Sequence, residues 1–341
     1  MAMLTLTRTR FDEPTALRLS KTQTGRIRRM GLALCTAVLV AGPTMAEEAG
    51  GNAMEEFKVE TTPSPVRMNP DKLAGVDLTA GEPFIAPEDI LEGSHQPRGD
   101  YLYSGKELIV EIFEDGPATL AIAEPFPVDE YVMVMSGKLI LTDADGQVQE
   151  FVAGDSLMVP KGFTGTWQML GNYRELIVVE RESYEKSFEN ASKTKEAGGS
   201  AKEEVKVQTA PSPERMNPDK LAGVDLTAGE PFLAPEDLLE GSHRPRGDAL
   251  YWGEELIVEI YEDDPGTHAI TGPFPVDEYV MVMSGKLILT DADGQAQEFV
   301  AGDSLMVPKG FTGTWQMRGN YRELIVVKRE SYENAFKAAE N

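Results

Sequence analysis

The sequence has little of the chemistry that most catalytic and metal sites use. Its 341 residues include one cysteine, Cys35, and three histidines, His95, His243 and His268. A single cysteine cannot form an internal disulfide or a thiolate zinc site. The Gly-x-Ser-x-Gly and P-loop strings are also absent, so the sequence gives no support to a serine hydrolase or a P-loop nucleotidase.

Long apolar runs are lacking as well. The run at 30–41 follows Arg26, Arg28 and Arg29 and ends in small residues at 44–46. It is too short to span a bilayer, and its three-part layout is that of a secretory signal. We therefore expect a signal peptide at 1–46, by the general or the twin-arginine route, and a periplasmic or secreted protein that has no membrane contact after cleavage.

Positive charge is scarce. The chain has 57 acidic and 32 basic residues, a net charge of −25. Because a polyanion repels phosphate backbones, we expect no nucleic-acid partner.

What the chain does contain is a long internal repeat. Residues 66–188 recur without a gap at 214–336, at about 85 % identity. A unit of this length is a whole domain, so the repeat indicates a tandem duplication. The predicted parts are a flexible arm at 47–65, a first domain at 66–188, a linker at 189–213 and a second domain at 214–341.

Each repeat begins with a loop-rich segment and continues as short strands. Runs of β-prone residues are separated by Gly, Pro or Asp-Gly turns, and they predict strands at 108–113, 130–135, 138–142, 147–152, 156–159, 166–169 and 175–179. Asp145-Gly146 predicts a tight hairpin. Such spacing is typical of an all-β antiparallel sandwich or barrel.

The predicted strand at 130–135 is apolar on both faces. Tyr131, Met133 and Met135 share one face, and an antiparallel strand that met water there would be polar. We expect the other copy to cover this face, which makes the chain an intrachain pseudo-dimer. The paired methionines then belong to an interface core rather than to a copper site.

Two short motifs carry a resemblance to a known family. Glu130 and Gly137 match an E(X)6G pattern, and Gly154, Pro160 and Gly162 match G(X)5PXG, with both patterns repeated in the second copy. These resemble the two motifs of the cupin superfamily. The resemblance implies two tandem cupin jelly-roll barrels, each with an interior that holds a ligand.

The family's metal-binding histidines are missing from the motifs. The resemblance places them near 124, 126 and 165 and near 272, 274 and 313, where this chain has Glu, Phe and Gly, and Gly, Phe and Gly. Only the carboxylates of Glu130 and Glu278 remain. One carboxylate does not make a metal site, so we expect no metal and no cofactor.

A longer string narrows the resemblance. Residues 160–167 and 308–315 match Pro-x-Gly-x-x-Gly-x-Trp, which is similar to the cupin subgroup of the ethanolamine-utilisation protein and (S)-ureidoglycine aminohydrolase. The metal-bearing domain of that aminohydrolase keeps histidine ligands. Their absence here argues against the same activity.

Strand parity identifies candidate residues for a pocket in each barrel. Glu130, Trp167 and Met169 should point inward, and Arg174 is a candidate partner for the carboxylate. The equivalents are Glu278, Trp315, Met317 and Arg322. The alternative is structural: the indole fills the core and a buried Glu130–Arg174 ion pair holds the barrel.

The histidines give weaker candidates. His95 and His243 lie in the loop-rich segments, either as lids over the barrel mouths or as surface residues. His268 replaces Leu120 in the second copy only. Since it lies four residues before the motif position, we do not expect it to be a metal ligand.

Three functions remain open. The first is an exported two-domain protein that binds a small molecule in each barrel without a histidine-held metal. The second is an enzyme, a hydrolase, isomerase or lyase, that uses Glu130 or Glu278 as acid or base. The third is an interaction scaffold.

Overall fold

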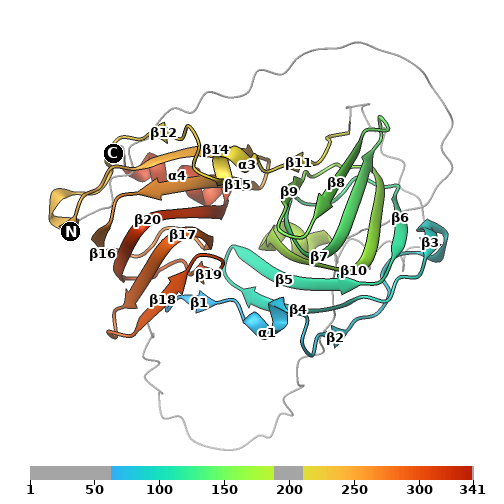
Figure 1. Ribbon diagram of the computed structural model, residues 1–341, viewed down its shortest axis with the longest axis horizontal. Helices are drawn as coiled ribbons and strands as arrows, with labels where there is room; N and C mark the ends of the chain where they lie inside the picture. Colours follow the sequence, from blue (N-terminus) through green and yellow to red (C-terminus); the bar gives the residue numbers. More distant parts are fainter. Residues whose placement is uncertain (1–62, 188–209, 340–341) are drawn as a thin grey trace, which may run out of the picture.

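The computed structural model describes residues 63–187 and 210–339. The predicted signal peptide lies outside the described residues, as do most of the arm and most of the linker. The described parts form two β-barrels side by side, the first blue to green and the second yellow to red (Figure 1). The fold is therefore mostly β, as the strand pattern predicts.

The elements of the first copy follow in chain order. They are β1 (Val66–Arg67), α1 (Pro70–Leu73), β2 (Thr79–Ala80), the 3-10 helix η1 (Pro87–Asp89), β3 (Ile90–Gly93), β4 (Arg98–Ser104), β5 (Leu108–Asp115), β6 (Ala118–Ile122), β7 (Glu130–Asp143), β8 (Val148–Val152), β9 (Ser156–Val159) and β10 (Gly165–Glu180). A helix follows at 181–187.

The second copy repeats this order. Its elements are β11 (Glu214–Arg215), α3 (Pro218–Leu221), β12 (Thr227–Ala228), η2 (Pro235–Asp237), β13 (Leu238–Gly241), β14 (Arg246–Trp252), β15 (Leu256–Asp263), β16 (Gly266–Ile270), β17 (Glu278–Asp291), β18 (Ala296–Val300), β19 (Ser304–Val307), β20 (Gly313–Lys328) and α4 (Arg329–Ala339).

The long strands β7 and β10 each join two strands that the sequence predicts separately. Strand β7 continues through Gly137, whose φ is +72°, and a Cβ there would lie 2.7 Å from the carbonyl oxygen of Leu170. Strand β10 continues through a register shift between Leu170 and Arg174. Glycine and the bulge let each strand bend around the barrel without ending. The sequence analysis missed strand β6, whose alternation is Ala-Thr-Leu-Ala-Ile.

The Asp145-Gly146 hairpin forms as predicted, between β7 and β8. Gly146 has a φ of +79°, and its N–H donates to the carbonyl oxygen of Asp143 over 2.9 Å. This left-handed conformation is the one that glycine accepts most readily.

The two copies exchange their first strands. Strand β1 of the first copy pairs antiparallel with β19 of the second, and β11 of the second copy pairs with β9 of the first. Figure 1 shows both short strands lying against the other barrel. Each barrel sheet of ten strands is therefore completed by a strand from the opposite copy.

One apolar cluster contains residues of both copies. Tyr131 and Tyr279 are fully buried in it, with ring centroids 6.0 Å apart, and Met133 and Met135 pack against it. The cluster covers the second apolar face of β7, which explains why that strand lacks a polar side.

Two buried carboxylates add polar contacts between the copies. Asp277 accepts hydrogen bonds from the N–H groups of Glu107 and Lys309, both over 2.8 Å. Asp129 accepts the equivalent bonds, from the N–H group of Glu255 in the other copy over 2.8 Å and from that of Lys161 in its own copy over 3.0 Å. Each aspartate thus ties its own barrel to the turn before a core strand of the other.

Among the residues that the structure describes, no helix has the length and apolar character needed to cross a membrane.

Candidate functional site

The second barrel contains a cavity of about 350 Å³. Its inner wall comes from four strands of the barrel and from the loop before β17. The side chains on this wall include Tyr261, His268, Phe274, Glu278, Trp315, Met317 and Glu323. Residues of β14 and α4, including Trp252 and Tyr332, continue the lining outward. A cavity of this size falls within the range of small-molecule sites.

Around the equivalent residues of the first barrel, the space that the described part of the chain encloses is small. Seven residues surround a space of about 10 Å³, namely Phe84, Phe113, Leu120, Glu130, Trp167, Met169 and Glu175. This is near the minimum for one water molecule. Their seven counterparts all line the larger cavity, so the two copies differ in the space around the same positions.

The aromatic wall is the same in both barrels. Trp315 stacks on Phe274 with ring centroids 6.1 Å apart, and Trp167 stacks on Phe126 at 6.2 Å. Trp315 remains 8 % exposed because it faces the cavity, whereas Trp167 is 2 % exposed. Strand parity thus placed both indoles correctly inside, but only one of them borders a sizeable space.

Glu259, Glu278 and Glu323 line the cavity from β15, β17 and β20. Burial raises the pKa of Glu259 to about 6, against a hydrogen bond from Tyr332 that lowers it. Burial also raises the pKa of Glu323 to about 8, although the hydroxyl of Tyr321 donates to it. The pKa of Glu278 is raised by burial and by the nearby charges of Glu323 and Glu259. Glu259 and Glu323 can therefore exchange protons near neutrality.

The first barrel repeats this arrangement without the space. Burial raises the pKa of Glu130, with Glu175 and Glu111 adding to the effect. Burial raises the pKa of Glu175 to about 8, while the hydrogen bond from Tyr173 lowers it. The inward position expected for Glu130 and Glu278 is the observed one.

Arg174 and Arg322 line neither of the two spaces, and the Glu130–Arg174 ion pair of the structural alternative is not formed. Arg174 instead pairs with Glu114 over 3.0 Å and donates to the carbonyl oxygen of Leu73 over 3.1 Å. Arg322 pairs with Glu262 over 2.9 Å in the same way. Glu114 lies opposite Arg174 in the ladder between β5 and β10, so the ion pair forms across neighbouring strands on the face away from the lumen.

His95 and His243 are buried, so neither is a surface residue. The Nδ1 atom of His95 lies 2.6 Å from the carboxylate of Asp115, and that of His243 lies 2.5 Å from Asp263. Each aspartate ends strand β5 or β15 and also accepts a backbone N–H from the residue after the histidine. The segment before each barrel is thus anchored inside it, rather than lying over its mouth as a lid.

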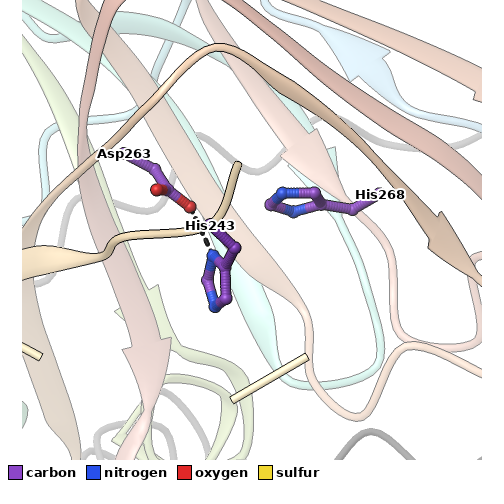
Figure 2. A group of neighbouring side chains, drawn as sticks. All are labelled: His243, Asp263 and His268. Carbon is purple, nitrogen blue, oxygen red and sulfur yellow. Dashed lines mark hydrogen bonds and ion pairs between the residues drawn. The ribbon is translucent and has the colours of Figure 1, made fainter. Parts of the chain in front are cut away.

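His268 lies beside this pair, which the sequence analysis did not expect. His243, Asp263 and His268 each offer a ligand atom within 4.8 Å of the others, and all three are buried (Figure 2). The imidazole rings of the two histidines are 5.1 Å apart and nearly perpendicular. His268 meets His243 because strand pairing between distant parts of the chain places β16 beside the segment before β14.

Burial and the neighbouring His243 lower the pKa of His268 to about 4, so this imidazole is neutral near pH 7. Burial alone would raise the pKa of Asp263, but hydrogen bonds from His243, Tyr261 and the Arg244 N–H outweigh it, and the net shift is downward. The cluster therefore combines an ionised carboxylate with a neutral imidazole.

The metal site that the cupin motifs imply does not fit these residues. At the motif positions Phe274 stacks on Trp315, and Gly313 has no side chain. Glu278 is the one remaining ligand of that set, and we assign no chemistry to a metal there.

Comparison with known proteins agrees with the fold. Residues 117–174 and 259–323 match the family model described as a EutQ-like cupin domain. Both matched segments lie within the barrels, one in each copy. The chain thus carries two domains of the cupin fold in tandem.

Solved structures align with the chain at low identity. A Pseudomonas syringae pv. tomato protein of unknown function aligns with a TM-score of 0.54 and 14 % identity over 78 % of this chain and 99 % of its own. A cupin 2 conserved barrel domain protein from Leptotrichia buccalis aligns at a TM-score of 0.42 and 12 % identity, over 74 % and 99 %.

A variant of Bacillus subtilis oxalate decarboxylase aligns at a TM-score of 0.36 and 15 % identity, over 76 % of this chain and 81 % of its own. At 14 % identity, the likeness to the Pseudomonas syringae protein concerns the fold alone. No curated protein sequence matches the chain.

Proposed function

We propose that the protein binds a small organic molecule in the lumen of its second barrel. The observation that carries this proposal is the cavity of about 350 Å³ bounded by Trp315, Met317 and Glu278. An aromatic and thioether wall with a few polar groups is the usual composition of a small-ligand site. The first barrel then serves as a closed structural counterpart.

A thermal-shift screen of the full chain against carboxylates, sugars and ureides tests the proposal. A ligand that raises the melting temperature should lose its effect in Glu278→Gln and keep it in the matched control Glu130→Gln. Burial raises the pKa of both carboxyls, so the same exchange of carboxyl for amide is made in a comparable environment in each barrel. A ligand that depends equally on both residues, or on neither, would contradict a site in the second barrel.

A second candidate function is acid–base catalysis in the same lumen. The specific observation is that Glu259 and Glu323 have pKa values of about 6 and about 8, so one is mostly ionised and the other largely protonated at pH 7. Pairs of carboxyls with separated pKa values are typical of acid–base sites. An enzyme would convert a ligand found in the screen and would lose this activity in Glu323→Gln. A binding protein would leave the ligand unchanged.

The narrower relationship is also a proposal. The Pro-x-Gly-x-x-Gly-x-Trp strings support kinship with the ethanolamine-utilisation and ureidoglycine-aminohydrolase subgroup. Release of ammonia from ureidoglycine by the purified protein tests for that activity. The family's motif histidines are absent, so we expect none.

We further propose that the protein is exported and that its two halves act as an intrachain pseudo-dimer. The apolar run at 30–41 supports export, and N-terminal sequencing of the secreted protein should give a start near residue 47. The exchanged strands β1 and β11 support the pseudo-dimer. After proteolysis of the linker, the two halves should elute together in gel filtration; separate elution would contradict this.

A further inference from the structure

We propose that the second barrel holds one divalent transition-metal ion between His243, Asp263 and His268, called here the His–Asp–His cluster. Two imidazoles and one carboxylate are the ligand set of many zinc and non-haem iron sites, which leave positions open for water or substrate. This site differs from the motif positions 272, 274 and 313 and replaces the expectation that the barrels hold no metal.

The distances fit one ion. Ligand atoms of all three residues lie within 4.8 Å of one another. Two imidazoles bound to one tetrahedral zinc ion through bonds of ~2.1 Å have ring centres about 5 Å apart. The observed separation of the two rings is 5.1 Å, and Figure 2 shows His243 below Asp263 and His268 to the right of both.

His268 has an unused ligand atom. Its Nε2 atom is buried and has no hydrogen-bond partner, and the residue as a whole is 5 % exposed. A buried polar atom without a hydrogen-bond partner destabilises the folded state. Coordination of an ion would satisfy it, and His268 also lines the cavity, so an open coordination position would face the lumen.

The second ligand must give up its present bonds. His243 Nδ1 donates to Asp263 over 2.5 Å, and its Nε2 accepts from the Phe232 N–H over 3.2 Å. On metal binding, the ion takes the place of the Nδ1 proton, which passes to Nε2. Binding therefore costs the weak bond to Phe232, and it widens the contact between Nδ1 and the carboxylate oxygen.

Hydrogen bonds around Asp263 hold the third ligand in place. Its Oδ2 accepts from the Tyr261 hydroxyl over 2.8 Å, and its Oδ1 accepts the N–H groups of Arg244 and Asp264, both over 2.7 Å. Bonds of this kind orient metal ligands and fix their charge.

The differences between the copies gather at this cluster. Three of them are Leu120 to His268, Phe113 to Tyr261 and Ala118 to Gly266. His268 supplies a ligand, Tyr261 supplies a hydroxyl for Asp263, and Gly266 leaves space. A Cβ at Gly266 would lie 3.0 Å from the carbonyl oxygen of Ser242 and 3.5 Å from His268 Nε2. Two more, Gln96 to Arg244 and Gly116 to Asp264, create an ion pair of 2.6 Å beside the cluster.

The test uses the full chain, stripped with a chelator and titrated with Zn²⁺ and with Co²⁺. We expect one ion per chain by elemental analysis and, with Co²⁺, the visible absorption of a tetrahedral site. His268→Leu, which restores the residue of the first copy, should weaken binding by on the order of 100-fold or more, above the loss seen for outer-sphere changes. His268→Asn, a polar variant, should have the same effect, and His95→Leu should leave binding unchanged.

Absence of stoichiometric binding to the unaltered chain would overturn the proposal. So would retention of the Co²⁺ spectrum in His268→Leu or in His268→Asn, because the ion would then lie elsewhere. Metal binding requires no organic ligand, so this test can fail or succeed independently of the proposed small-molecule site.

Discussion

The two barrels are built from nearly the same sequence, yet their interiors differ. About 85 % of the aligned residues are identical. A cavity of about 350 Å³ extends from Trp315 outward to β14 and α4 in the second barrel, whereas the described residues beside Trp167 in the first barrel enclose a space of about 10 Å³. The substitutions nearest to it, Phe113 to Tyr261 and Leu120 to His268, barely change side-chain size but replace apolar groups with polar ones. A duplicated fold can thus keep its scaffold while the interior of one copy changes chemistry.

The largest expected effect is on packing of the two indoles. Trp167→Ala should lower the free energy of unfolding by about 3–5 kcal/mol, because the ring is fully packed. Trp315→Ala should lower the free energy of unfolding by at least about 1 kcal/mol less than Trp167→Ala does, since one side of its ring already faces a cavity. Urea denaturation of both variants measures the difference. Equal losses would contradict the contrast between a filled and a hollow barrel.

A polar substitution in the filled barrel comes next. Leu120→His should lower the free energy of unfolding by about 1–3 kcal/mol without metal, because it buries an imidazole in apolar surroundings. The neighbouring His95–Asp115 pair then resembles the His–Asp–His cluster. Zinc should restore part of the stability in this variant through preferential binding to the folded state. Thermal unfolding with zinc and with chelator checks both points, and a variant as stable as the parent without metal would contradict the first.

The buried carboxyls predict a dependence on pH that the barrels share. Burial raises the pKa of Glu323 from its ordinary value of 4.5 to about 8. The folded state therefore holds the proton longer than the unfolded state, so this group's contribution is full below pH 4.5 and is lost as pH rises to about 8.

Glu323→Gln should remove that loss, so the variant gains on the order of 1 kcal/mol or more relative to the parent between pH 5 and pH 8. Urea titrations at the two pH values measure it. Glu175→Gln is the matched variant in the first barrel, where the pKa is also about 8. A pH profile parallel to that of the parent in both variants would show that neither carboxyl is protonated in the folded state.

The smallest effect is expected at a difference outside the lumen. Leu170 and Arg318 occupy equivalent exposed positions, and Arg318 contacts Gln316 on its own strand. Arg318→Leu should change the free energy of unfolding by less than about 0.5 kcal/mol and leave ligand binding intact. Chemical denaturation provides the measurement, and a large change would give this position a role that its contacts do not explain.

Much of the fold could be predicted from the sequence because its determinants are local. A run of β-prone residues between Gly154 and Pro160 predicts the strand at 156–159 with its observed ends, and Asp145-Gly146 predicts the hairpin. The apolar second face of 130–135 correctly indicated that another surface covers it. The inward direction of Glu130 and Trp167 followed from strand parity, which needs no knowledge of the partner strands.

Contacts between distant segments could not be predicted in this way. The partner of Arg174 is Glu114 rather than Glu130, because strand register decides which residue lies opposite. The same holds for β1 and β11, which pair with the opposite copy. The spacing of His268 from the motif does not indicate a ligand, because the residues beside it come from segments before and after β14.

The sequence alone determined that the chain is a duplicated, histidine-poor, all-β protein, since repeat, composition and period are properties of the residues themselves. Tertiary structure alone decided that the second lumen is hollow and that His243, Asp263 and His268 meet there. Cavities and ligand clusters arise from the packing of residues far apart in the chain. The missing Cβ at Gly266 and the ring nitrogen of His268 therefore affect the site only in the folded barrel.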